Sequence, residues 1–535
     1  MSTVLPLESV HAAAGIVAAP HALAVEAGRD VLEEGGNALE AAIATAAAIA
    51  VVYPHMNHIG GDGFWLVREP SGRVRYVEAC GPAAGAATIA AYHERELETI
   101  PTRGPLAALT VPGAVGGWQL AAEGARVHGG RMSLPRLLER AIHYAAAGSP
   151  VSASQARLSQ EKKAQLESVP GFADAFLVDG AVPQPGSLQR APRLADTLDH
   201  LARAGLDDFY RGDIAREMAV DLERIGSPLA RADLARYRAR ERAPLKVELE
   251  AGTLYNAPPP TQGLASLLIL ALFERLKVGR AESFAHVHGL VEATKQAFLV
   301  RDTVVTDPDH LPHDPAQFLT AAALDARAAR IAPRRALPWP APANAGDTIW
   351  LGAADRSGLV VSYIQSIFFE FGSGCVLPAT GVLMQNRGAS FVLEKGHLRT
   401  LAPGRRPFHT LNPALAVLRD GRIIAYGTMG GEGQPQTQAA IFSRHVLFGM
   451  PLGEAIARPR WLLGRTWGET QTQLRLEAGF PDELIAALQS AGHDLAVLPD
   501  ALSDTMGHAG AVVLHPKGNL EGAHDIRADG GAAGI

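Results

Sequence analysis

The chain has 535 residues, of which 47% are hydrophobic and 19% are charged, and its formal net charge is −6. This composition is typical of a globular protein with a large core, and the excess of acid argues against nucleic acid as an obligate partner. The sequence contains no stretch of about 18 consecutive apolar residues, so no membrane-spanning helix is predicted. The N-terminus lacks the basic and apolar regions of a signal peptide, which makes a cytoplasmic enzyme the expectation.

Helical patterns with recognisable ends dominate the first half of the chain. Residues 22–34 form an amphipathic pattern that Gly35 and Gly36 stop, and Asn37 with Glu40 forms a capping box that opens a second, buried helix. A strand pair is expected at 64–67 and 74–77. Further helices are predicted at 134–147, 193–204, 213–225, 264–276 and 285–303.

The second half is richer in strands. A hairpin is predicted from 348–354 and 359–365, which are joined by a turn. More strands are expected at 381–385, 414–418, 423–426 and 511–515, with helices at 436–448 and 482–490. Strands clustered around residue 348, with helices on either side, predict an α+β fold in the form of a four-layer αββα sandwich. The two cysteines, Cys80 and Cys375, have no disulfide or metal-type spacing and are predicted to pack in the core.

The most informative feature is the junction where a Pro/Ala-rich run meets this hairpin. Four prolines between positions 333 and 342 exclude a helix or a central strand, so about 333–347 is predicted to be an exposed, flexible connector. The connector ends at Asp347, and Thr348 begins a buried strand. A cut before Thr348 would free an α-amine of pKa about 7.7–8.0, which can act as general base for the hydroxyl of the same residue. Threonine before a strand is also common in ordinary proteins, so the junction alone leaves both interpretations open.

A glycine-rich segment, Gly427-Thr-Met-Gly430-Gly431-Glu-Gly433, lies between a predicted strand and a helix. Adjacent glycines let two backbone N–H groups converge on one point, and the N-terminus of the following helix adds a positive dipole. These properties suit an oxyanion hole. An ordinary turn or a phosphate cradle is the alternative, although the lysine of a phosphate-binding loop is absent.

A third motif, from Pro403 to Pro413, contains Arg405, Arg406, His409 and a hydroxyl residue. Arginine offers a planar fork of donors that suits a substrate carboxylate. Each of these arginines could equally form a structural ion pair.

Other kinds of site are not supported. The histidines at 55 and 58, and at 310 and 313, lack the pattern of a zinc site, so neither a metal nor a cofactor is predicted. The chain has no nucleophile elbow of a serine hydrolase. The glycines at 60, 61 and 63 precede a strand instead of opening a helix, which disfavours a dinucleotide fingerprint.

These motifs occur in an order that resembles the γ-glutamyltranspeptidase family of N-terminal-nucleophile hydrolases, and the resemblance covers nearly the whole chain. Its matching segments are Gly15–His21, Glu33–Ala38, Pro54–Phe64, Val111–Gly116, Pro258–Gly263, Asp347-Thr348, Phe371–Gly374, Pro403–Pro407, Gly430-Gly431 and Gly522–Gly530. The resemblance implies a proenzyme that cuts itself between Asp347 and Thr348. The large chain, 1–347, and the small chain, 348–535, would form one intertwined domain.

The resemblance also implies roles for particular residues. Thr348 would be the nucleophile, a hydroxyl on the neighbouring strand would contact it, and a pair of glycines would form the oxyanion hole. The last two roles fall to Ser366 and to Gly430 with Gly431.

The positions that contact substrate in the family differ in this chain. The family's arginine in Arg-Glu-Thr-Ala-Pro has no counterpart in 78–82, and its acidic segment is replaced by 385–391, which carries Arg387. Phe368 stands in place of an asparagine, and His409 with Thr410 replaces two serines. The carboxylate that pairs a substrate amine is thus lost, while Arg387 and His409 supply donors. This pattern favours a small anionic amide without an amine and is similar to the branch that hydrolyses oxamate in purine breakdown.

Three interpretations follow. The first is hydrolysis of oxamate to oxalate and ammonia through a Thr348 acyl-enzyme. The second is a true γ-glutamyl hydrolase or transpeptidase that acts on glutathione-like substrates. The third is a non-catalytic homologue that binds a small carboxylate, which the retained Thr348 and Gly430-Gly431 argue against. The expected partners are a small-molecule amide and the two chains of one precursor, with neither nucleic acid nor membrane, and a homodimer of the processed heterodimer is a compatible assembly.

Overall fold

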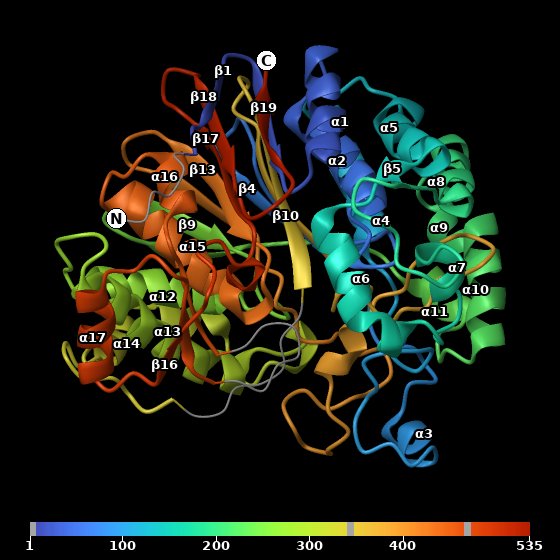
Figure 1. Cartoon of the computed structure of the whole chain (residues 1–535). Helices are drawn as coiled ribbons and strands as arrows, with labels where there is room; N and C mark the ends of the chain where they lie inside the picture. The colour runs from blue at the N-terminus through green and yellow to red at the C-terminus, as the bar shows by residue number, and fades with distance from the viewer. Residues whose placement is uncertain (1–6, 340–346, 465–471) are drawn as a thin grey trace.

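A computed structural model describes residues 7–339, 347–464 and 472–535 of the chain. Residues 340–346 of the predicted connector therefore lie outside the described residues. Two antiparallel sheets of seven strands each are stacked face to face, with helices on both outer sides (Figure 1). This arrangement is the predicted four-layer αββα sandwich.

The first sheet contains, in spatial order, β1 (Val10–Ala12), β18 (Leu520–His524), β17 (Ala509–Leu514), β13 (Ile423–Thr428), β12 (Ala414–Leu418), β9 (Gly252–Asn256) and β8 (Leu245–Glu248). The second sheet contains β19 (Gly531–Gly534), β2 (Gly15–Ala19), β10 (Asp347–Asp355), β11 (Val360–Phe368), β3 (Asp62–Arg68), β4 (Val74–Ala79) and β7 (Arg240–Arg242). Strands from both sides of the Asp347–Thr348 bond are thus interleaved in one sheet, because β10 pairs with β2 as well as with β11.

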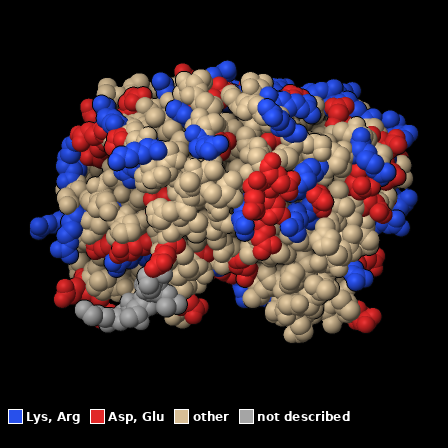
Figure 2. Space-filling view, turned by 90° about the horizontal axis from the view of Figure 1, so that it is seen from above, with Lys and Arg blue, Asp and Glu red and all other residues tan. Residues whose placement is uncertain are grey.

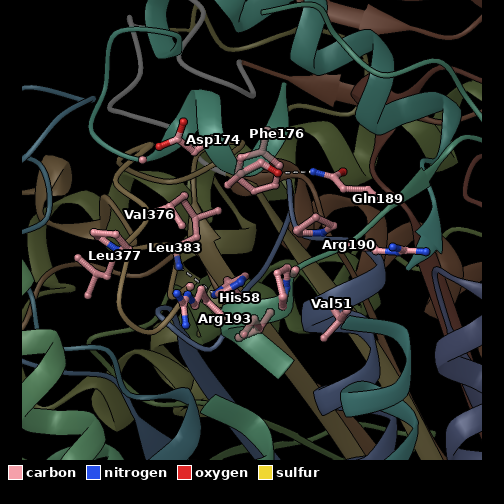
Figure 3. A pocket seen from close by; sticks show the side chains of 18 of the residues that line it. Val51, His58, Asp174, Phe176, Gln189, Arg190, Arg193, Val376, Leu377 and Leu383 are labelled. Atoms are coloured by element: carbon pink, nitrogen blue, oxygen red, sulfur yellow. Dashed lines mark hydrogen bonds between the residues drawn. The ribbon is translucent and has the colours of Figure 1, made fainter. Parts of the chain in front are cut away.

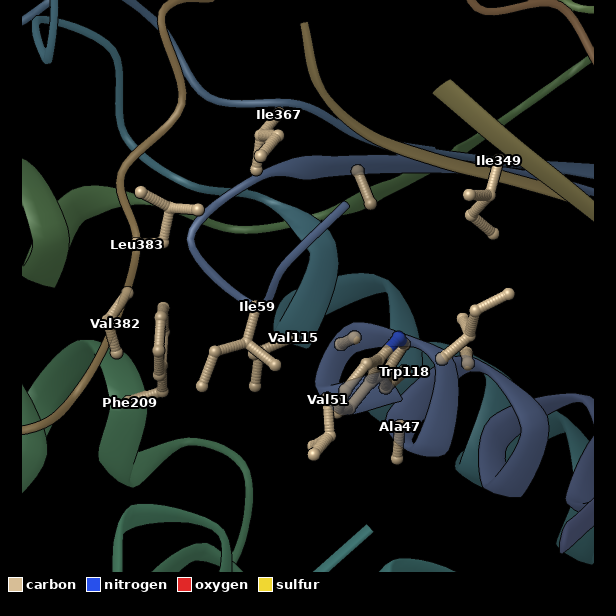
Figure 4. Packing of buried hydrophobic residues seen from close by; sticks show 14 of the residues in the cluster. Ala47, Val51, Ile59, Val115, Trp118, Phe209, Ile349, Ile367, Val382 and Leu383 are labelled. Atoms are coloured by element: carbon tan, nitrogen blue, oxygen red, sulfur yellow. The ribbon is translucent and has the colours of Figure 1, made fainter. Parts of the chain in front are cut away.

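Helices from the first half of the chain cover the second sheet. Those that contact its strands are α1 (Ala22–Glu33), α2 (Ala38–Val52) and α4 (Ala114–Val127). The helix α5 (Leu134–Ala147) packs on α2, and α8 (Pro192–Ala204) packs on α5. The same half of the chain also contains α6 (Ala153–Leu166) and α10 (Asp213–Ile225). The first sheet is covered by α12 (Gly263–Arg275), α13 (Phe284–Val304) and α15 (Gln434–Phe442), with α17 (Asp482–Ser490) beside α13. Figure 4 shows the packing of the first group, in which Ala47 and Val51 of α2 and Trp118 of α4 lie near Ile349 of the sheet.

The strand β10 alternates between two cores, as a buried strand with period two must. Ile349 and Leu351 belong to the core shared with the helices, whereas Trp350 belongs to the core between the two sheets. A side chain at Cβ of Gly427 on β13, or of Gly510 on β17, would collide with the indole of Trp350. The start of β10 is therefore held close to the ends of these two strands.

Most of the predicted elements are confirmed, including the helices at 134–147, 213–225 and 482–490 and the capping box of Asn37 and Glu40. The strand expected at 381–385 is wrong. The segment makes isolated bridges instead of a strand, because its backbone bonds to a loop and to side chains. Leu383 N–H donates to His58 Nδ1 (3.2 Å), and Ser373 Oγ donates to the Met384 carbonyl (2.8 Å). The predicted helix 436–448 is shorter, since α15 ends at Phe442 and a π-helical turn, Ser443–Leu447, follows.

Residues 333–339 of the connector have no regular secondary structure, and Arg334 and Arg335 are exposed, as predicted, whereas its last residue, Asp347, already belongs to β10. Its backbone is nevertheless anchored. The Leu337 carbonyl accepts a hydrogen bond from Lys295 Nζ (2.7 Å), and the Leu337 N–H donates to Glu292 Oε2 (3.0 Å). These two side chains of α13 are buried and paired with each other at 2.7 Å.

The face seen in Figure 2 carries basic and acidic side chains interspersed, with no field of a single sign. None of the described helices has the length and apolar character needed to cross a bilayer. Cys80 and Cys375 are both buried as free thiols, which confirms the prediction that they pack in the core.

Candidate active site

Thr348 lies at an irregular point of the strand ladder. The register pairs Asp347 with Phe368 and Ile349 with Gln365, so two residues of β11, Ser366 and Ile367, face the single residue Thr348. This two-against-one count is that of a β-bulge, a feature common next to active sites. Thr348 and Ser366 are both buried. The predicted nucleophile and its predicted hydroxyl neighbour are therefore opposite each other on adjacent strands.

The glycine-rich segment approaches the same end of β10. Two contacts across the interface between the sheets set the relative position of β10 and β17: Gly352 lies against Val512, and Trp350 lies against Gly510. Moving two more residues along each strand reaches Thr348 on β10 and His508, the residue before β17. Thr348 is therefore level with His508. The Met429 N–H donates to the His508 carbonyl (3.2 Å), and Gly430 follows directly. Thr348 and the glycine pair are thus brought to one level of the two stacked sheets.

The backbone of the glycine pair requires glycine. Gly430 has φ +110° and Gly431 has φ +53°, both in the left-handed region that side chains disfavour. A short 3₁₀ turn, Gly431–Gly433, then leads into α15, whose N-terminal dipole favours negative charge nearby. The segment therefore has the backbone of an anion-stabilising turn, at the same level of the stacked sheets as Thr348.

A buried cluster lies beside the end of β11. Arg387 is 1% exposed, and its guanidinium carbon stands 3.8 Å from the ring centroid of Phe368. Its Nη1 donates to Thr410 Oγ1 (3.4 Å), while its Nη2 has no hydrogen-bond partner among the described residues. Burial lowers the pKa of Arg387 to about 9, so the group remains a cation at neutral pH. Phe368 itself is held at φ +82°, a strained conformation of the kind that collects at functional sites.

His409 and a carboxylate that the sequence did not indicate complete this cluster. His409 is fully buried, and neither ring nitrogen has a hydrogen-bond partner among the described residues. Its Nε2 lies 3.6 Å from Asp62 Oδ2, at the first position of β3. Burial, and the nearby cation of Arg387, lower the pKa of His409, which keeps the imidazole neutral. Burial raises the pKa of Asp62 to about 7, against the opposing effect of Arg387.

Gln262 joins the cluster to the glycine pair. Its side-chain amide donates to the Gly431 carbonyl (2.8 Å) and to the Thr410 carbonyl (2.8 Å). Arg301, fully buried on α13, donates to the Gln262 side-chain oxygen (3.1 Å) and fixes the amide orientation. Gln262 lies in the Pro258–Gly263 motif, but that motif alone gave no reason to assign it this bridging position.

The structure separates the two arginines of the third motif from the two residues that follow. Arg406 forms ion pairs with Glu78 (2.9 Å) and Asp309 (2.5 Å), and Arg405 donates to the carbonyls of Leu398 and Thr400. Both arginines are therefore structural. His409 and Thr410, in contrast, lie in the cluster around Arg387.

A separate cavity of about 290 Å³ is lined in part by residues between Val376 and Leu383, which precede Arg387 in the chain (Figure 3). Its lining is mainly apolar and includes Val51, Phe176, Val376 and Leu383, with His58 bonded to the Leu383 N–H. It contains none of the residues of the cluster or of the glycine pair. Among the described residues, one set of side chains could ligate a cation, namely His288, Glu292 and His493, and its members instead bind one another and the connector.

Comparisons with known proteins agree with this architecture. The profile of the family described as Gamma-glutamyltranspeptidase matches residues 24–535. The chain is 53% identical to the Oxamate amidohydrolase proenzyme of Klebsiella pneumoniae, over 97% of this chain and 98% of that protein. It is 40% identical to the Glutathione hydrolase-like YwrD proenzyme of Bacillus subtilis, over 97% of this chain and 98% of that protein. The crystal structure of cephalosporin acylase from Bacillus halodurans superimposes with a TM-score of 0.90 at 32% identity, covering 99% of this chain and 97% of the other.

Proposed function

This chain belongs to the gamma-glutamyltranspeptidase family, and we propose that it is a self-processing amidohydrolase that converts oxamate to oxalate and ammonia. The observation that carries the proposal is the buried cluster beside Phe368, the residue that pairs with Asp347 in the strand ladder, where Arg387 Nη2 and the His409 ring have no hydrogen-bond partner among the described residues. Native proteins rarely leave buried donors unpaired, so a small carboxylate is the group that this cluster fits. The high identity to a relative named for oxamate supports the same substrate.

Maturation is the first step of the proposal. Thr348 Oγ attacks the carbonyl carbon of Asp347, the peptide nitrogen leaves as the Thr348 α-amine, and water hydrolyses the resulting ester. The products are chains 1–347 and 348–535. The bulge opposite Thr348 supports this step, because the scissile peptide is not locked into a regular ladder. Until the bond breaks, the nitrogen is an amide and cannot serve as a base.

The mature site then performs acyl transfer to water. The α-amine takes the proton from Thr348 Oγ while the oxygen attacks the amide carbon of oxamate. The N–H groups of Gly430 and Gly431 stabilise the oxyanion, and the ammonium returns the proton to the leaving nitrogen, which departs as ammonia. Water, deprotonated by the same amine, hydrolyses the oxalyl ester to release oxalate. Arg387 forks onto the carboxylate of oxamate and so orients the adjacent amide carbon.

The proposal is tested with purified protein by gel analysis and by an ammonia assay with oxamate. The wild type should run as two co-purifying chains and release ammonia, whereas Thr348→Ala should stay a single inactive chain. Thr348→Ser, which keeps a hydroxyl, is the matched control and should still be processed. Arg387→Ala should raise KM for oxamate. Arg387→Lys should recover only part of this loss of affinity, because lysine keeps the positive charge but lacks the bidentate geometry of arginine. Efficient turnover of a γ-glutamyl anilide together with inert oxamate would overturn the proposed substrate.

The position of the Asp62 carboxylate favours the second candidate function, a γ-glutamyl hydrolase. An ionised Asp62 beside Arg387 could pair the ammonium of an amino acid head group while Arg387 holds its carboxylate. Burial disfavours the ionised carboxylate that this pairing requires, which supports oxamate over the zwitterion. The anilide assay separates these candidates, and ammonia release by the mature protein excludes a non-catalytic carboxylate-binding role.

A further inference from the structure

The contacts that Asp62 makes within the fold do not require an acidic side chain at this position. One carboxylate oxygen, Oδ1, accepts hydrogen bonds from the N–H groups of Gly113 (2.9 Å) and Gly81 (3.3 Å). The other oxygen, Oδ2, is buried and has no hydrogen-bond partner of regular geometry among the described residues, although the Gln385 side chain lies near enough to act on the pKa of Asp62. Gly113 and Gly81 could be bonded by a neutral amide equally well, so these contacts do not explain a buried acid.

Oδ2 is one of several unpaired polar atoms that come together here from distant parts of the chain. The others are Arg387 Nη2, Gln385 Oε1 and both ring nitrogens of His409. Each unpaired buried group costs about 1–3 kcal/mol of folding free energy. A cluster of such atoms next to Phe368, which pairs with the residue before the proposed nucleophile, indicates a place for a polar ligand, with Asp62 in its wall.

A substrate carboxylate bound in this cluster would lie close to Asp62 as well as to Arg387. Two carboxylates that share a buried site cannot both be ionised without a large cost, so one of them takes a proton. The other titratable groups that face Asp62 do not supply it. Burial raises the pKa values of Cys80, Tyr210, Tyr237 and Tyr363, which keeps them neutral, and burial with the Arg387 cation keeps His409 neutral.

We propose that Asp62 is a specificity-determining residue that binds the substrate anion together with a proton, its Oδ2–H facing the substrate carboxylate next to neutral His409. The inference rests on the proposed function. The cation of Arg387 then attracts the anion, and the protonated Asp62 removes the repulsion and adds a donor. An ammonium-bearing substrate would need the opposite, an ionised Asp62, and would bind better as pH rises.

The proposal makes substrate binding, and not the chemical step, sensitive to Asp62. Since burial raises the pKa of Asp62 to about 7 in the free protein, the acid is ionised above neutral pH and an anion must then bring a proton with it. KM for oxamate should rise roughly tenfold per pH unit above this point. The kcat value instead follows the Thr348 α-amine, which must be unprotonated, so kcat should rise over the same range.

The test uses the mature enzyme, with oxamate for kinetics between pH 6 and 9 and oxalate as a non-reacting probe for calorimetry. Titration in buffers of different ionisation enthalpy should show uptake of close to one proton per oxalate near pH 8. Asp62→Asn keeps an oxygen for the Gly81 and Gly113 N–H groups, and should abolish both the uptake and the pH dependence of KM. Glu370→Gln is the matched control, because Glu370 is another buried carboxyl of raised pKa but faces Arg103 (3.8 Å), and the KM slope should persist.

The outcomes distinguish this inference from the proposed function. Oxamate turnover with a pH-independent KM in the wild type would overturn the inference alone, as would an unchanged slope in Asp62→Asn. Loss of proton uptake in His409→Gln but not in Asp62→Asn would also overturn the inference, because this result would assign the bound proton to His409. Absence of both oxamate turnover and oxalate binding would overturn the proposed function. If Asp62→Asn does not fold, proton uptake by the wild type still decides, since no uptake near pH 8 contradicts the inference.

Discussion

Replacing Lys295 by methionine should release the connector from the body of the protein. Lys295 and Glu292 are each 2% exposed, and together they bond both backbone groups of Leu337. Methionine keeps the aliphatic length of lysine but leaves the Glu292 carboxylate buried without its cation. Breaking a buried ion pair in this way costs about 3–5 kcal/mol. If the loss falls on the connector alone, its open fraction should increase roughly 10²–10⁴-fold.

Limited trypsin digestion measures this opening, because Arg334 and Arg335 are exposed and lie just before Leu337. Cleavage there, followed by mass spectrometry, should be much faster in Lys295→Met than in the wild type. Lys277→Met is the matched control, since Lys277 pairs with Glu250 on the surface (2.7 Å) and exposed pairs contribute about 0–1 kcal/mol. The double variant Glu292→Gln with Lys295→Met should recover part of the protection. Equal digestion rates in Lys295→Met and Lys277→Met would refute the role of the buried pair.

Two further predictions concern the glycine pair and Asp62. Gly431→Val forces a branched residue into φ +53° and displaces a donor, so kcat should fall on the order of 10²–10³-fold in protein that still folds, and a kcat close to wild type would show that the segment is only a turn. Because the folded-state pKa of Asp62 is raised from 3.8 to about 7, the unfolded chain loses this proton first, and wild-type stability should fall as pH rises between these values. From pH 5 to 8 the wild type should lose roughly 2–3 kcal/mol relative to Asp62→Asn, about 2–3 °C in Tm, whereas parallel Tm profiles would contradict the shift.

The helices were predictable where their ends carry local signals. The helix α5 begins after a Ser133 cap with Pro135 in its first turn and ends at Gly148, and the predicted bounds 134–147 match. The helix α4 was missed because Gly116 and Gly117 resemble a loop. In the structure Gly117 is needed for close packing, since a Cβ there would lie 2.9 Å from the indole nitrogen of Trp65. Tertiary contact, which no local pattern reveals, decides that segment.

The residues of the candidate site likewise fall into two groups, those in continuous sequence motifs and those brought together only by tertiary contacts. The nucleophile junction and the glycine pair are continuous motifs, so their residues could be proposed from the sequence, although their catalytic roles stay predictions. Asp62 could not be proposed, because it joins the site through pairing of β3 with β11 and through His409, which is remote in sequence. A signal was present nonetheless: a charged residue stands among glycines at the start of an apolar strand, where an unpaired acid is costly to bury.

Phe368 makes a contact in the structure that the sequence did not reveal. The sequence indicated only that Phe368 replaces an asparagine of the family, and the structure adds a cation–π contact with Arg387 at 3.8 Å. Phe368→Leu keeps an apolar side chain but removes the ring, so Arg387 should lose about 0.5–2 kcal/mol of positioning energy. KM for oxamate should then rise roughly 2–30-fold with little change in kcat. Phe369→Leu is the control, since Phe369 stacks on Phe368 (4.5 Å) and not on the guanidinium. A fall in kcat at constant KM would mean that Phe368 acts on the strand opposite Thr348 instead of on substrate binding.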